Sequence, residues 1–488
     1  MANEFRGPLP VKVDATSNGE FRPVPLPEHV TRANAEAEQR IGDHARRAGL
    51  GRRAFLQSLC GAATTLLTLN EAFAALGNTG GQFRVPKEGA FETAAAAEAL
   101  AGDEFIFDVQ THMVDPAGAW RSSAGKYWEK ILASFPQGSC GDNDPVACFS
   151  ADQFIKHVFL DSDTDLAVLS FVPELPENNP LSLEEADRVR VLVDRLEGAR
   201  RLFLHAMVVP NAGPKVAPLQ LMKDAVDRYP IAAWKCYTQW GPKGIGFELD
   251  SPDVGIPFIE RARELGVRNI CIHKGLLFSG FPEKLGRCAD VGRAAKLYPD
   301  MNFIIYHSGY EAGTTERAYD RARARRGVDS LIRSVEDNGI ARNANVYAEL
   351  GSTWRFVMRD PTTAAHLLGK LLKHIGQDNV LWGTDSIWYG SPQDQIQAFR
   401  SYQIAPALID AHGYPELTPA LKQKVFGLNG ARVYGVDVPE RRRKTEADPV
   451  GKRKAAYREA ADPTFETYGP KTDAEYDALI AERGSLPA

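Results

Sequence analysis

The sequence has little excess charge, few cysteines and no long apolar run. Its 488 residues carry a formal net charge of −5, which is too small a field to recruit nucleic acid or an anionic membrane. No stretch reaches the roughly 20 apolar residues that a membrane-spanning helix needs. A hydrophobic content of 44% with 25% charged residues excludes a disordered or fibrous chain. A globular protein that acts on a small-molecule substrate is therefore expected, without a nucleic-acid partner or a stable membrane span.

Only six cysteines occur in the chain. Cys140 and Cys148 flank a loop of Gly, Asp, Asn and Pro residues, which an oxidising compartment could close with a disulfide. The sequence does not decide whether Cys140 and Cys148 form this disulfide or remain free thiols. Cys236 and Cys271 fall inside predicted strands, where a reduced, buried cysteine that packs is the favoured interpretation.

The N-terminal region resembles a twin-arginine export signal. Gly-Arg-Arg at 51–53 precedes a modestly apolar run at 58–69, and Ala-Phe-Ala at 72–74 offers the small residues that a signal peptidase cleaves. Residues 1–74 are therefore predicted to be a signal region, which places the mature protein in the periplasm or outside the cell. The alternative is an ordinary amphipathic N-terminal helix of a cytoplasmic protein. Residues 75–104, rich in Gly and Ala, are predicted to be a linker.

From residue 105 onwards, short β-rich runs alternate with helical patterns. The eight runs with strand character are 105–112, 166–172, 202–209, 232–237, 269–273, 302–307, 345–349 and 379–385. This α/β alternation predicts a parallel sheet covered by helices, and eight units predict closure into a (β/α)₈ TIM-type barrel over residues 105–436. An open doubly wound sheet would need a glycine fingerprint after the first strand, and none is present there.

The C-terminal region, residues 437–488, differs from the barrel in composition. It is polar and charged, and Pro439, Pro449, Pro463 and Pro470 interrupt any long helix. We expect an extended arm that wraps on the barrel or mediates oligomerisation.

Polar residues suited to metal binding or proton transfer stand where four predicted strands end. Gln110 and His112 close the first strand, His273 the fifth, His307 the sixth and Asp385 the eighth. Because the C-terminal ends of barrel strands face one mouth, these side chains are expected to converge. Imidazole nitrogens and carboxylate oxygens bind divalent metals at about 2.0–2.2 Å. The pattern therefore predicts a metal site.

The segments around these residues resemble the amidohydrolase superfamily. They are Asp-x-Gln-x-His at 108–112, Ile-His-Lys-Gly at 272–275, Tyr-His-Ser-Gly at 306–309, Leu-Trp-Gly-Thr-Asp at 381–385 and the closing segment 426–435. Within the superfamily, the branch that includes aminocarboxymuconate-semialdehyde decarboxylase is the most similar.

The resemblance implies one divalent metal ion, zinc or manganese. It implies that His112, His273 and Asp385 hold the ion and that Asp385 also takes a proton from metal-bound water. His307 is implied to stand beside the ion as a general acid/base. Members of this superfamily are often dimers, so a homodimer is also implied.

Gln110 departs from the family pattern. Most relatives begin with His-x-His, and some decarboxylases have glutamate first, whereas glutamine keeps an oxygen but loses the charge. Residues two apart on a strand face the same way, so Gln110 and His112 still point together. We predict Gln110 as the fourth metal ligand, and three interpretations remain: a working site in which this ligand is weaker or replaced by water, a site changed for substrate binding with the metal retained elsewhere, and a metal-free descendant.

Further polar and aromatic residues follow the strand ends. Lys235 is predicted to be a buried cation that pairs with Glu349 or with a substrate carboxylate. Glu349 is either a second catalytic acid/base or only that partner. Lys274, Trp354 and Trp388 are predicted to rim the mouth and bind substrate. An aromatic rim suits a planar aromatic or muconate-like acid, although large aromatics also cap barrels for packing alone.

Two reactions fit this predicted site. We place first a metal-dependent hydrolase that acts on a lactone, ester or amide bond of a small, aromatic or carboxylated substrate. The alternative is a metal-dependent non-oxidative decarboxylase of an aromatic or muconate-like acid. Gln110 favours decarboxylation slightly, whereas export favours hydrolysis of external compounds. A function of another class is an extracytoplasmic ligand-binding barrel without turnover.

Overall fold

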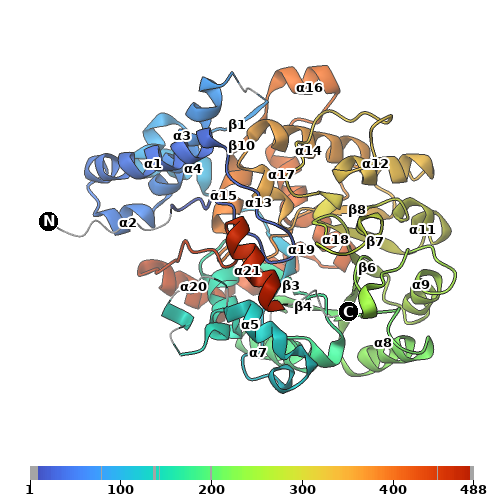
Figure 1. Cartoon of the computed structure of the whole chain (residues 1–488). Coiled ribbons are helices and arrows are strands. Elements are labelled where there is room, and N and C mark those ends of the chain that lie inside the picture. The colour runs from blue at the N-terminus through green and yellow to red at the C-terminus, as the bar shows by residue number, and fades with distance from the viewer. Residues whose placement is uncertain are drawn as a thin grey trace.

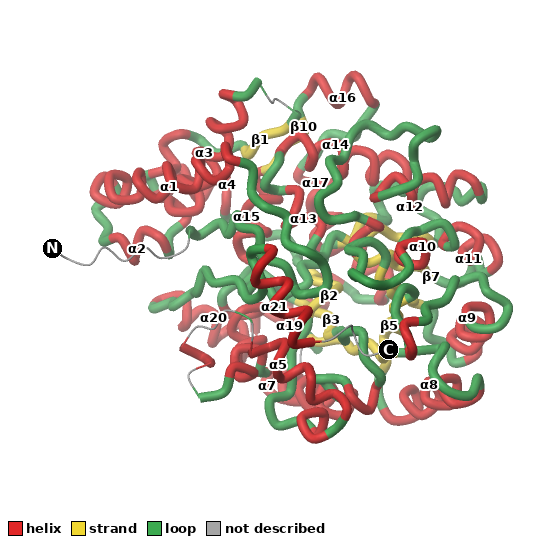
Figure 2. Tube along the Cα trace, viewed as in Figure 1, coloured by secondary structure: helices red, strands yellow, loops and turns green. Residues whose placement is uncertain are grey.

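Eight parallel strands form the centre of the molecule, and helices surround them (Figures 1 and 2). The computed structural model describes residues 9–77, 80–133, 135, 139–141, 143–197, 200–447 and 449–483. The barrel strands are β2 (Phe107–Thr111), β3 (Leu166–Leu169), β4 (Leu202–Met207), β5 (Ile231–Tyr237), β6 (Asn269–His273), β7 (Asn302–Tyr306), β8 (Val346–Glu349) and β9 (Val380–Leu381). They pair in chain order, and each overlaps one of the eight predicted runs.

Main-chain hydrogen bonds join the last strand to the first. Val109 N donates to Trp382 O at 3.0 Å, and Asp385 N donates to Gln110 O at 2.9 Å. A parallel bridge between Thr111 and Ser386 continues this pairing towards the mouth. The sheet therefore closes on itself, which confirms the predicted barrel and rules out the open sheet.

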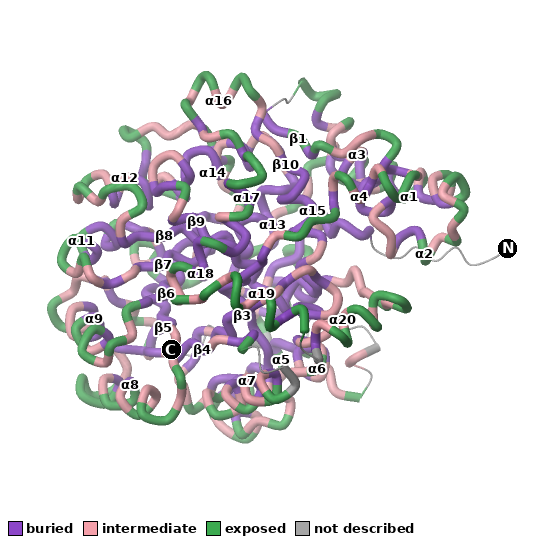
Figure 3. Tube along the Cα trace, turned by 180° about the vertical axis from the view of Figure 1, so that it is seen from behind, coloured by how far each residue is buried: buried purple, intermediate pink, exposed green. Residues whose placement is uncertain are grey.

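The strand sequences explain why the sheet lies inside. In β6 and β7, Ile270, Ile272, Phe303 and Ile305 are all fully buried, and such β-branched and aromatic residues suit strands that are covered on both faces. Their outward side chains meet the apolar stripes of the surrounding helices. Figure 3 shows the buried strands inside a ring of helices whose outer faces are exposed.

The main helices outside the barrel are α7 (Leu183–Glu197), α8 (Val216–Arg228), α9 (Gly255–Glu264), α11 (Val291–Leu297), α12 (Gly327–Asp337), α14 (Pro361–His374), α15 (Gln393–Ser401), α16 (Pro406–His412), α17 (Pro419–Gln423) and α18 (Asn429–Tyr434). Helix α12 shows how they pack. It buries Val328, Leu331, Ile332 and Val335, a spacing that places four apolar side chains on one helical face.

The long connection after β2 covers one side of the mouth. It contains α5 (Tyr127–Ala133) and leads into the short α6 (Ala151–Phe154). Cys140 and Cys148, whose bonding the sequence did not decide, are joined in a disulfide with a Cα–Cα distance of 5.0 Å. Cys236 and Cys271 are free and buried, as predicted.

The N-terminal region forms helices that pack beside the barrel. They are α1 (Glu28–Arg47), α2 (Arg52–Leu56) and α3 (Leu59–Ala75), followed by β1 (Gly81–Phe83) and α4 (Thr93–Leu100). Helices α1 and α3 contact each other closely, and β1 pairs antiparallel with β10 (Tyr402–Ile404). The apolar run of the predicted signal thus lies in α3, where Cys60, Leu66 and Phe73 are at most 3% exposed.

The C-terminal region returns to the mouth of the barrel. Its helices are α19 (Val438–Ala447), α20 (Pro449–Glu459) and α21 (Asp473–Arg483). Between α20 and α21, Tyr468 N donates to Trp388 O at 3.0 Å. In Figure 1, the irregular dark-blue segment near the N-terminus passes next to the red α21 across the face of the barrel. In the part of the chain that the structure describes, no helix combines the length and apolar character needed to cross a membrane.

Candidate active site

Four buried polar side chains stand at the C-terminal ends of four barrel strands. His112 follows β2, His273 ends β6, His307 follows β7 and Asp385 follows β9. Each is at most 3% exposed. The strands hold them at the same end of the barrel, because parallel strands present their C-terminal ends to one mouth.

The imidazoles of His273 and His307 face each other, with 3.2 Å between His307 Nε2 and His273 Nδ1. A backbone carbonyl stands on the outer side of each ring: Gly351 O lies 2.7 Å from His307 Nδ1, and Leu276 O lies 3.4 Å from His273 Nε2. A carbonyl can only accept a hydrogen bond, so the neutral His307 ring carries its proton on Nδ1 and presents the lone pair of Nε2 to His273. The His273 ring either donates to this lone pair from Nδ1 or carries its proton on Nε2 towards Leu276 O, which leaves Nδ1 as a second free lone pair for a cation.

Both imidazoles are neutral at neutral pH. Burial lowers the pKa of His307 to about 4. The pKa of His273 falls well below its ordinary value, first through burial and then through electrostatic repulsion by His307 and Lys235, which disfavours a second proton in this cluster. Neutral imidazole is the form that binds a metal ion or accepts a proton, so both rings are ready for either role.

Asp385 accepts hydrogen bonds on both carboxylate oxygens. Oδ1 lies 3.0 Å from His112 Nε2 and 3.0 Å from Gln110 Nε2, and Oδ2 lies 2.6 Å from Ser352 Oγ. Burial alone would raise the pKa of Asp385, but the hydrogen bond and charge of His112 outweigh it and lower that pKa. The carboxylate is therefore ionised at neutral pH. Gln110 Oε1 is buried and has no hydrogen-bond partner among the described residues.

Several site residues have left-handed backbone conformations. The φ angles are +64° at His307, +60° at Asp385 and +54° at Ser352. Non-glycine residues adopt such values at an energetic cost, and they persist where the surrounding structure imposes them, often at functional sites. Here the turns aim the three side chains back across the mouth.

A segment from the N-terminus enters the same mouth. Asn18 Nδ2 lies 3.4 Å from Asp385 Oδ2. A carboxylate oxygen of Glu20 and one nitrogen each of His273 and His307 all lie within 4.8 Å of one another. Among the described residues, no other three side chains of His, Cys, Asp or Glu bring their ligand atoms within 4.8 Å of one another.

The predicted metal ligands His112, His273 and Asp385 therefore fall into two separate contact groups. His112 and Asp385 contact each other directly, whereas His273 contacts His307 and stands near Glu20. That His112, His273 and Asp385 share one ion stays a prediction.

A small cavity lies beside His112, Asp385 and Glu20. Its volume is about 20 Å³, and Asn18, Glu20, Gln110, His112 and Asp385 line it together with aromatic side chains of the surrounding loops. That volume holds about one water molecule. A substrate therefore needs the segment carrying Asn18 and Glu20, or the aromatic side chains, to move aside. A larger cavity of about 670 Å³ lies beside α8, and its described lining contains no histidine.

Comparison with known proteins identifies the family. The sequence profile of the amidohydrolase family matches residues 182–436, which is more than half of the chain. The chain belongs to the amidohydrolase family. The matched region contains His273, His307 and Asp385 but begins after Gln110 and His112. No curated protein matches this amidohydrolase.

Several solved structures are similar to this amidohydrolase at low identity. 5-Carboxyvanillate decarboxylase from Sphingomonas paucimobilis is 12% identical, with 69% of this chain and 100% of that chain covered and a TM-score of 0.42. 2,6-Dihydroxybenzoate decarboxylase from Rhizobium is 15% identical, with coverages of 68% and 99% and a TM-score of 0.37. 4-Oxalomesaconate hydratase from Rhodopseudomonas palustris is 16% identical, with coverages of 73% and 99% and a TM-score of 0.39.

Glu349 holds the backbone of the amidohydrolase site. Its Oε2 accepts a hydrogen bond from His307 N at 3.1 Å, and its Oε1 accepts one from Gly351 N at 2.6 Å. A Cβ atom at position 383 would overlap Oε1, so Gly383 makes room for the carboxylate. Burial raises the pKa of Glu349 well above its usual value. These contacts make Glu349 a positioning residue for the His307 turn, and its role as a second acid/base stays a prediction.

Replacing Glu349 by glutamine should therefore destabilise the fold. Glutamine offers one carbonyl oxygen where two backbone N–H groups each need an acceptor, and its amide nitrogen would face one of these donors. A buried donor that loses its partner costs about 1–3 kcal/mol. Urea unfolding of the two proteins measures the difference, and an unchanged free energy of unfolding would contradict this role of Glu349.

Lys235 does not pair with Glu349, contrary to one of the two predictions for it. Its ammonium is fully buried and has no hydrogen-bond partner among the described residues. It lies 4.0 Å from the ring centroid of Tyr306 and 4.5 Å from that of Tyr237. Burial lowers the pKa of Lys235. The other predicted partner, a substrate carboxylate, is still open to this side chain.

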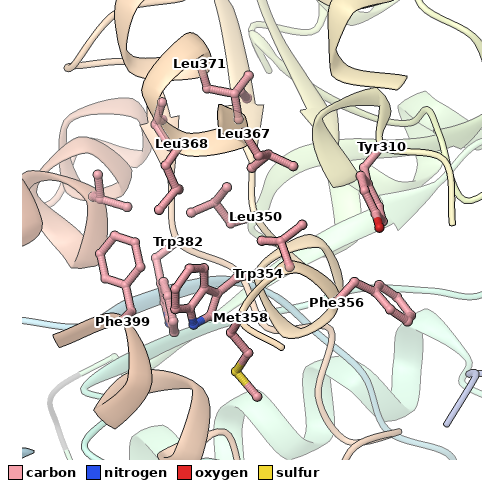
Figure 4. Close-up of a cluster of buried hydrophobic side chains, with 14 of the residues drawn as sticks. Tyr310, Leu350, Trp354, Phe356, Met358, Leu367, Leu368, Leu371, Trp382 and Phe399 are labelled. Carbon is pink, nitrogen blue, oxygen red and sulfur yellow. The ribbon is translucent and has the colours of Figure 1, made fainter. Parts of the chain in front are cut away.

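Two of the predicted substrate-binding residues are part of the packed structure. Lys274 is fully buried, and its Nζ lies 2.8 Å from Asp290 Oδ1. Trp354 packs edge-on against Phe399 inside the cluster that Figure 4 shows. These two residues do not rim the mouth, because their side chains are occupied by other contacts. Trp388 does line the cavity and packs against His112, as predicted.

Asn18 and Glu20 were not found from the sequence. They lie in an irregular segment inside the predicted signal region, ahead of its arginine pair, with no strand pattern to place them. The only local signal is the turn-forming pair Asn18-Gly19 next to an acidic residue, which is common in surface loops.

Proposed function

We propose that this amidohydrolase is a metal-dependent hydrolase that acts on the carbonyl group of a lactone, ester or amide. The observation that carries the proposal is the pair of facing, neutral imidazole nitrogens of His273 and His307 next to the ionised Asp385. These groups supply both metal ligands and proton acceptors in one buried mouth.

The residues present fit a divalent metal ion. His307 Nε2 presents a lone pair towards His273 Nδ1 at 3.2 Å, and His112 and Asp385 add a nitrogen and a carboxylate to the donor set. Nitrogen and oxygen ligands suit zinc or manganese. When bound, such an ion polarises a carbonyl group and brings the pKa of a bound water towards neutrality.

The protein's own residues would manage the protons. Asp385 is ionised at neutral pH and can accept a proton from an attacking water. Ser352 and Gln110 hold its two oxygens in place. His307, fixed by Gly351 O, presents its Nε2 to His273, and this nitrogen would take up or return a proton. Trp388 and Tyr237 line the cavity and would keep bulk water out of it.

Decarboxylation of a small aromatic or muconate-like acid is the second candidate. The observation that favours it is Lys235, a buried ammonium without a hydrogen-bond partner among the described residues. A substrate carboxylate would satisfy this cation, and both a decarboxylase and a hydrolase of carboxylated compounds would use it.

The experiment that tests these proposals combines metal content with a substrate panel. Purified full-length protein is analysed for bound metals and then assayed with lactones, aryl esters, anilides and hydroxybenzoates. We expect stoichiometric zinc or manganese and hydrolysis of one carbonyl class, abolished by a chelator and restored by metal. Release of carbon dioxide without hydrolysis would establish the decarboxylase instead. A metal-free protein that binds a panel compound without turnover would indicate a ligand-binding barrel.

Replacing Lys235 by methionine is expected to have two effects. The free energy of unfolding should rise by about 1–3 kcal/mol, because methionine fills the space without an unsatisfied buried charge. For a carboxylated substrate, KM should rise at least about 10-fold, because the buried cation no longer offsets the carboxylate. An uncharged analogue serves as the control. Equal KM values for both substrates would remove Lys235 from the substrate site.

We also propose that the N-terminal region remains on the working protein. The burial of Leu66 and Phe73 in α3 supports this proposal, because the helix is then part of the fold. The arginine pair at 52–53 supports the competing prediction, in which the region is a signal for export of the folded chain. A homodimer is a further prediction, which light scattering of the purified protein checks.

A further inference from the structure

We propose that Glu20 is a metal ligand supplied from outside the barrel. In this role it would restore the negative charge that is missing at Gln110. The inference rests on the proposed metal-dependent function and assigns an additional ligand to the same site.

The distances bring Glu20 to the facing imidazoles. One of its carboxylate oxygens, His273 Nδ1 or Nε2 and a ring nitrogen of His307 lie within 4.8 Å of one another. Ligand atoms that share an ion at about 2.1 Å each lie up to about 4.2 Å apart. Small side-chain adjustments therefore suffice to place an ion between the three groups.

The turn that carries Glu20 is built to present its carboxylate. Asn18 Nδ2 donates to Glu20 Oε2 at 2.8 Å, and Glu20 N donates to Asn18 Oδ1 at 3.1 Å. Gly19 between them has a φ of +87°, and a Cβ there would lie 3.3 Å from Leu479. The turn therefore needs glycine at this position.

The C-terminal region fixes the turn over the mouth. Ser17 N donates to Pro470 O at 2.9 Å, and a Cβ at Gly469 would overlap Ser17 O. Arg22 pairs with Asp473 and Asp477 of α21 at 3.2 and 2.6 Å. Ser17 and its neighbour Thr16 are fully buried. The two ends of the chain thus hold Glu20 in place before any ion binds.

Charge balance gives a reason for the arrangement. A divalent cation among neutral imidazoles needs negative ligands to offset its charge in a buried site. Asp385 supplies one, and Gln110 supplies none. Glu20 supplies the second from a different part of the chain, which explains how a site with an uncharged glutamine on its first strand would hold a divalent metal.

Calorimetric titration of the chelator-treated full-length protein with Zn²⁺ and Mn²⁺ tests the inference. We expect Glu20→Gln to raise the Kd at least about 10-fold, the smallest loss usual even for residues that only support metal ligands. The matched control is Glu28→Gln, because Glu28 is an exposed residue at the start of α1, and its Kd should equal that of the wild type. Thermal unfolding without metal should be the same for all three proteins.

The outcomes separate this inference from the proposed function. If the wild type binds neither metal, the metal-dependent function fails. If the wild type binds and Glu20→Gln binds equally well, the function stands and the role of Glu20 is refuted. If Glu20→Gln does not fold, Glu20→Asp is tested instead, because aspartate keeps the charge but has a side chain shorter by one methylene group. The role of Glu20 is refuted as well if this variant keeps the wild-type Kd and the wild-type rise in Tm on metal binding.

Discussion

Replacing Asp385 by asparagine is expected to lower kcat by about 10²–10⁴-fold, the range for loss of a positioned proton acceptor. The carboxylate accepts hydrogen bonds from His112 and Gln110 on one oxygen and from Ser352 on the other. Asparagine retains one acceptor oxygen but has no charge and cannot take up a proton at neutral pH. The bound metal content, measured on the same sample, should fall as well.

Asparagine is the informative substitution because of the backbone. Asp385 has a φ of +60°, and asparagine tolerates this left-handed conformation better than most residues. The variant should therefore keep its fold, and circular dichroism should match the wild type. Asp253→Asn is the matched control, since the Asp253 side chain is 95% exposed, and its kcat should not change. A fully active Asp385→Asn protein would remove this residue from the chemistry.

The barrel could be predicted from the sequence because its signals are local and repeated. Each strand is a short apolar run, and the polar residues that end the runs, such as His273 and Asp385, lie at one mouth once the strands are parallel. The sequence pattern could place these residues at strand ends but could not determine their partners. His112 meets Asp385 and His273 meets His307, and these pairings depend on turn conformations such as the positive φ of His307.

The features that the sequence did not reveal are contacts between residues that lie far apart in the chain. Glu20 reaches the site through an irregular segment that has no periodicity, and its neighbours there come from the opposite end of the chain. Lys274 follows a strand end, as a substrate-binding residue would, but Asp290 lies close enough to bind it. Trp354 has the size and position of a rim aromatic, yet packs inward. Only the assembled fold decides between these alternatives.

The N-terminal region shows the same ambiguity on a larger scale. An apolar run of about a dozen residues fits both a signal sequence and a buried helix, because both need side chains that leave water. In the structure, the run packs in α3 against α1, and Phe55, Leu66 and Leu69 belong to the same core cluster as residues of the barrel. The segment before it carries Asn18 and Glu20 into the mouth. The arginine pair alone could not reveal these contacts.

Removing residues 1–74 is expected to abolish cooperative unfolding. Full burial of one large apolar side chain contributes about 1.5–3 kcal/mol, and the deleted segment buries Phe55, Leu56, Leu66, Leu69 and Phe73 to 3% exposure or less. The deletion would also uncover the apolar surface of α4 and α15 that faces α3. The expected loss exceeds about 5 kcal/mol, the lower end of typical domain stability. Scanning calorimetry and near-ultraviolet circular dichroism of the truncated chain, which begins at Ala75, measure the result.

Arg52→Lys with Arg53→Lys in the full-length chain provides the matched control. Arg53 is largely exposed, and its pairing with Asp462 at 2.5 Å lies at the surface, where ion pairs contribute little. This variant should unfold as the wild type does, while twin-arginine export would stop. If the shortened chain instead unfolds cooperatively and binds metal, residues 1–74 are a removable signal. In that case the mass of the protein recovered from the periplasm should match the chain from Ala75 onwards, and Glu20 could not be a ligand of the working site.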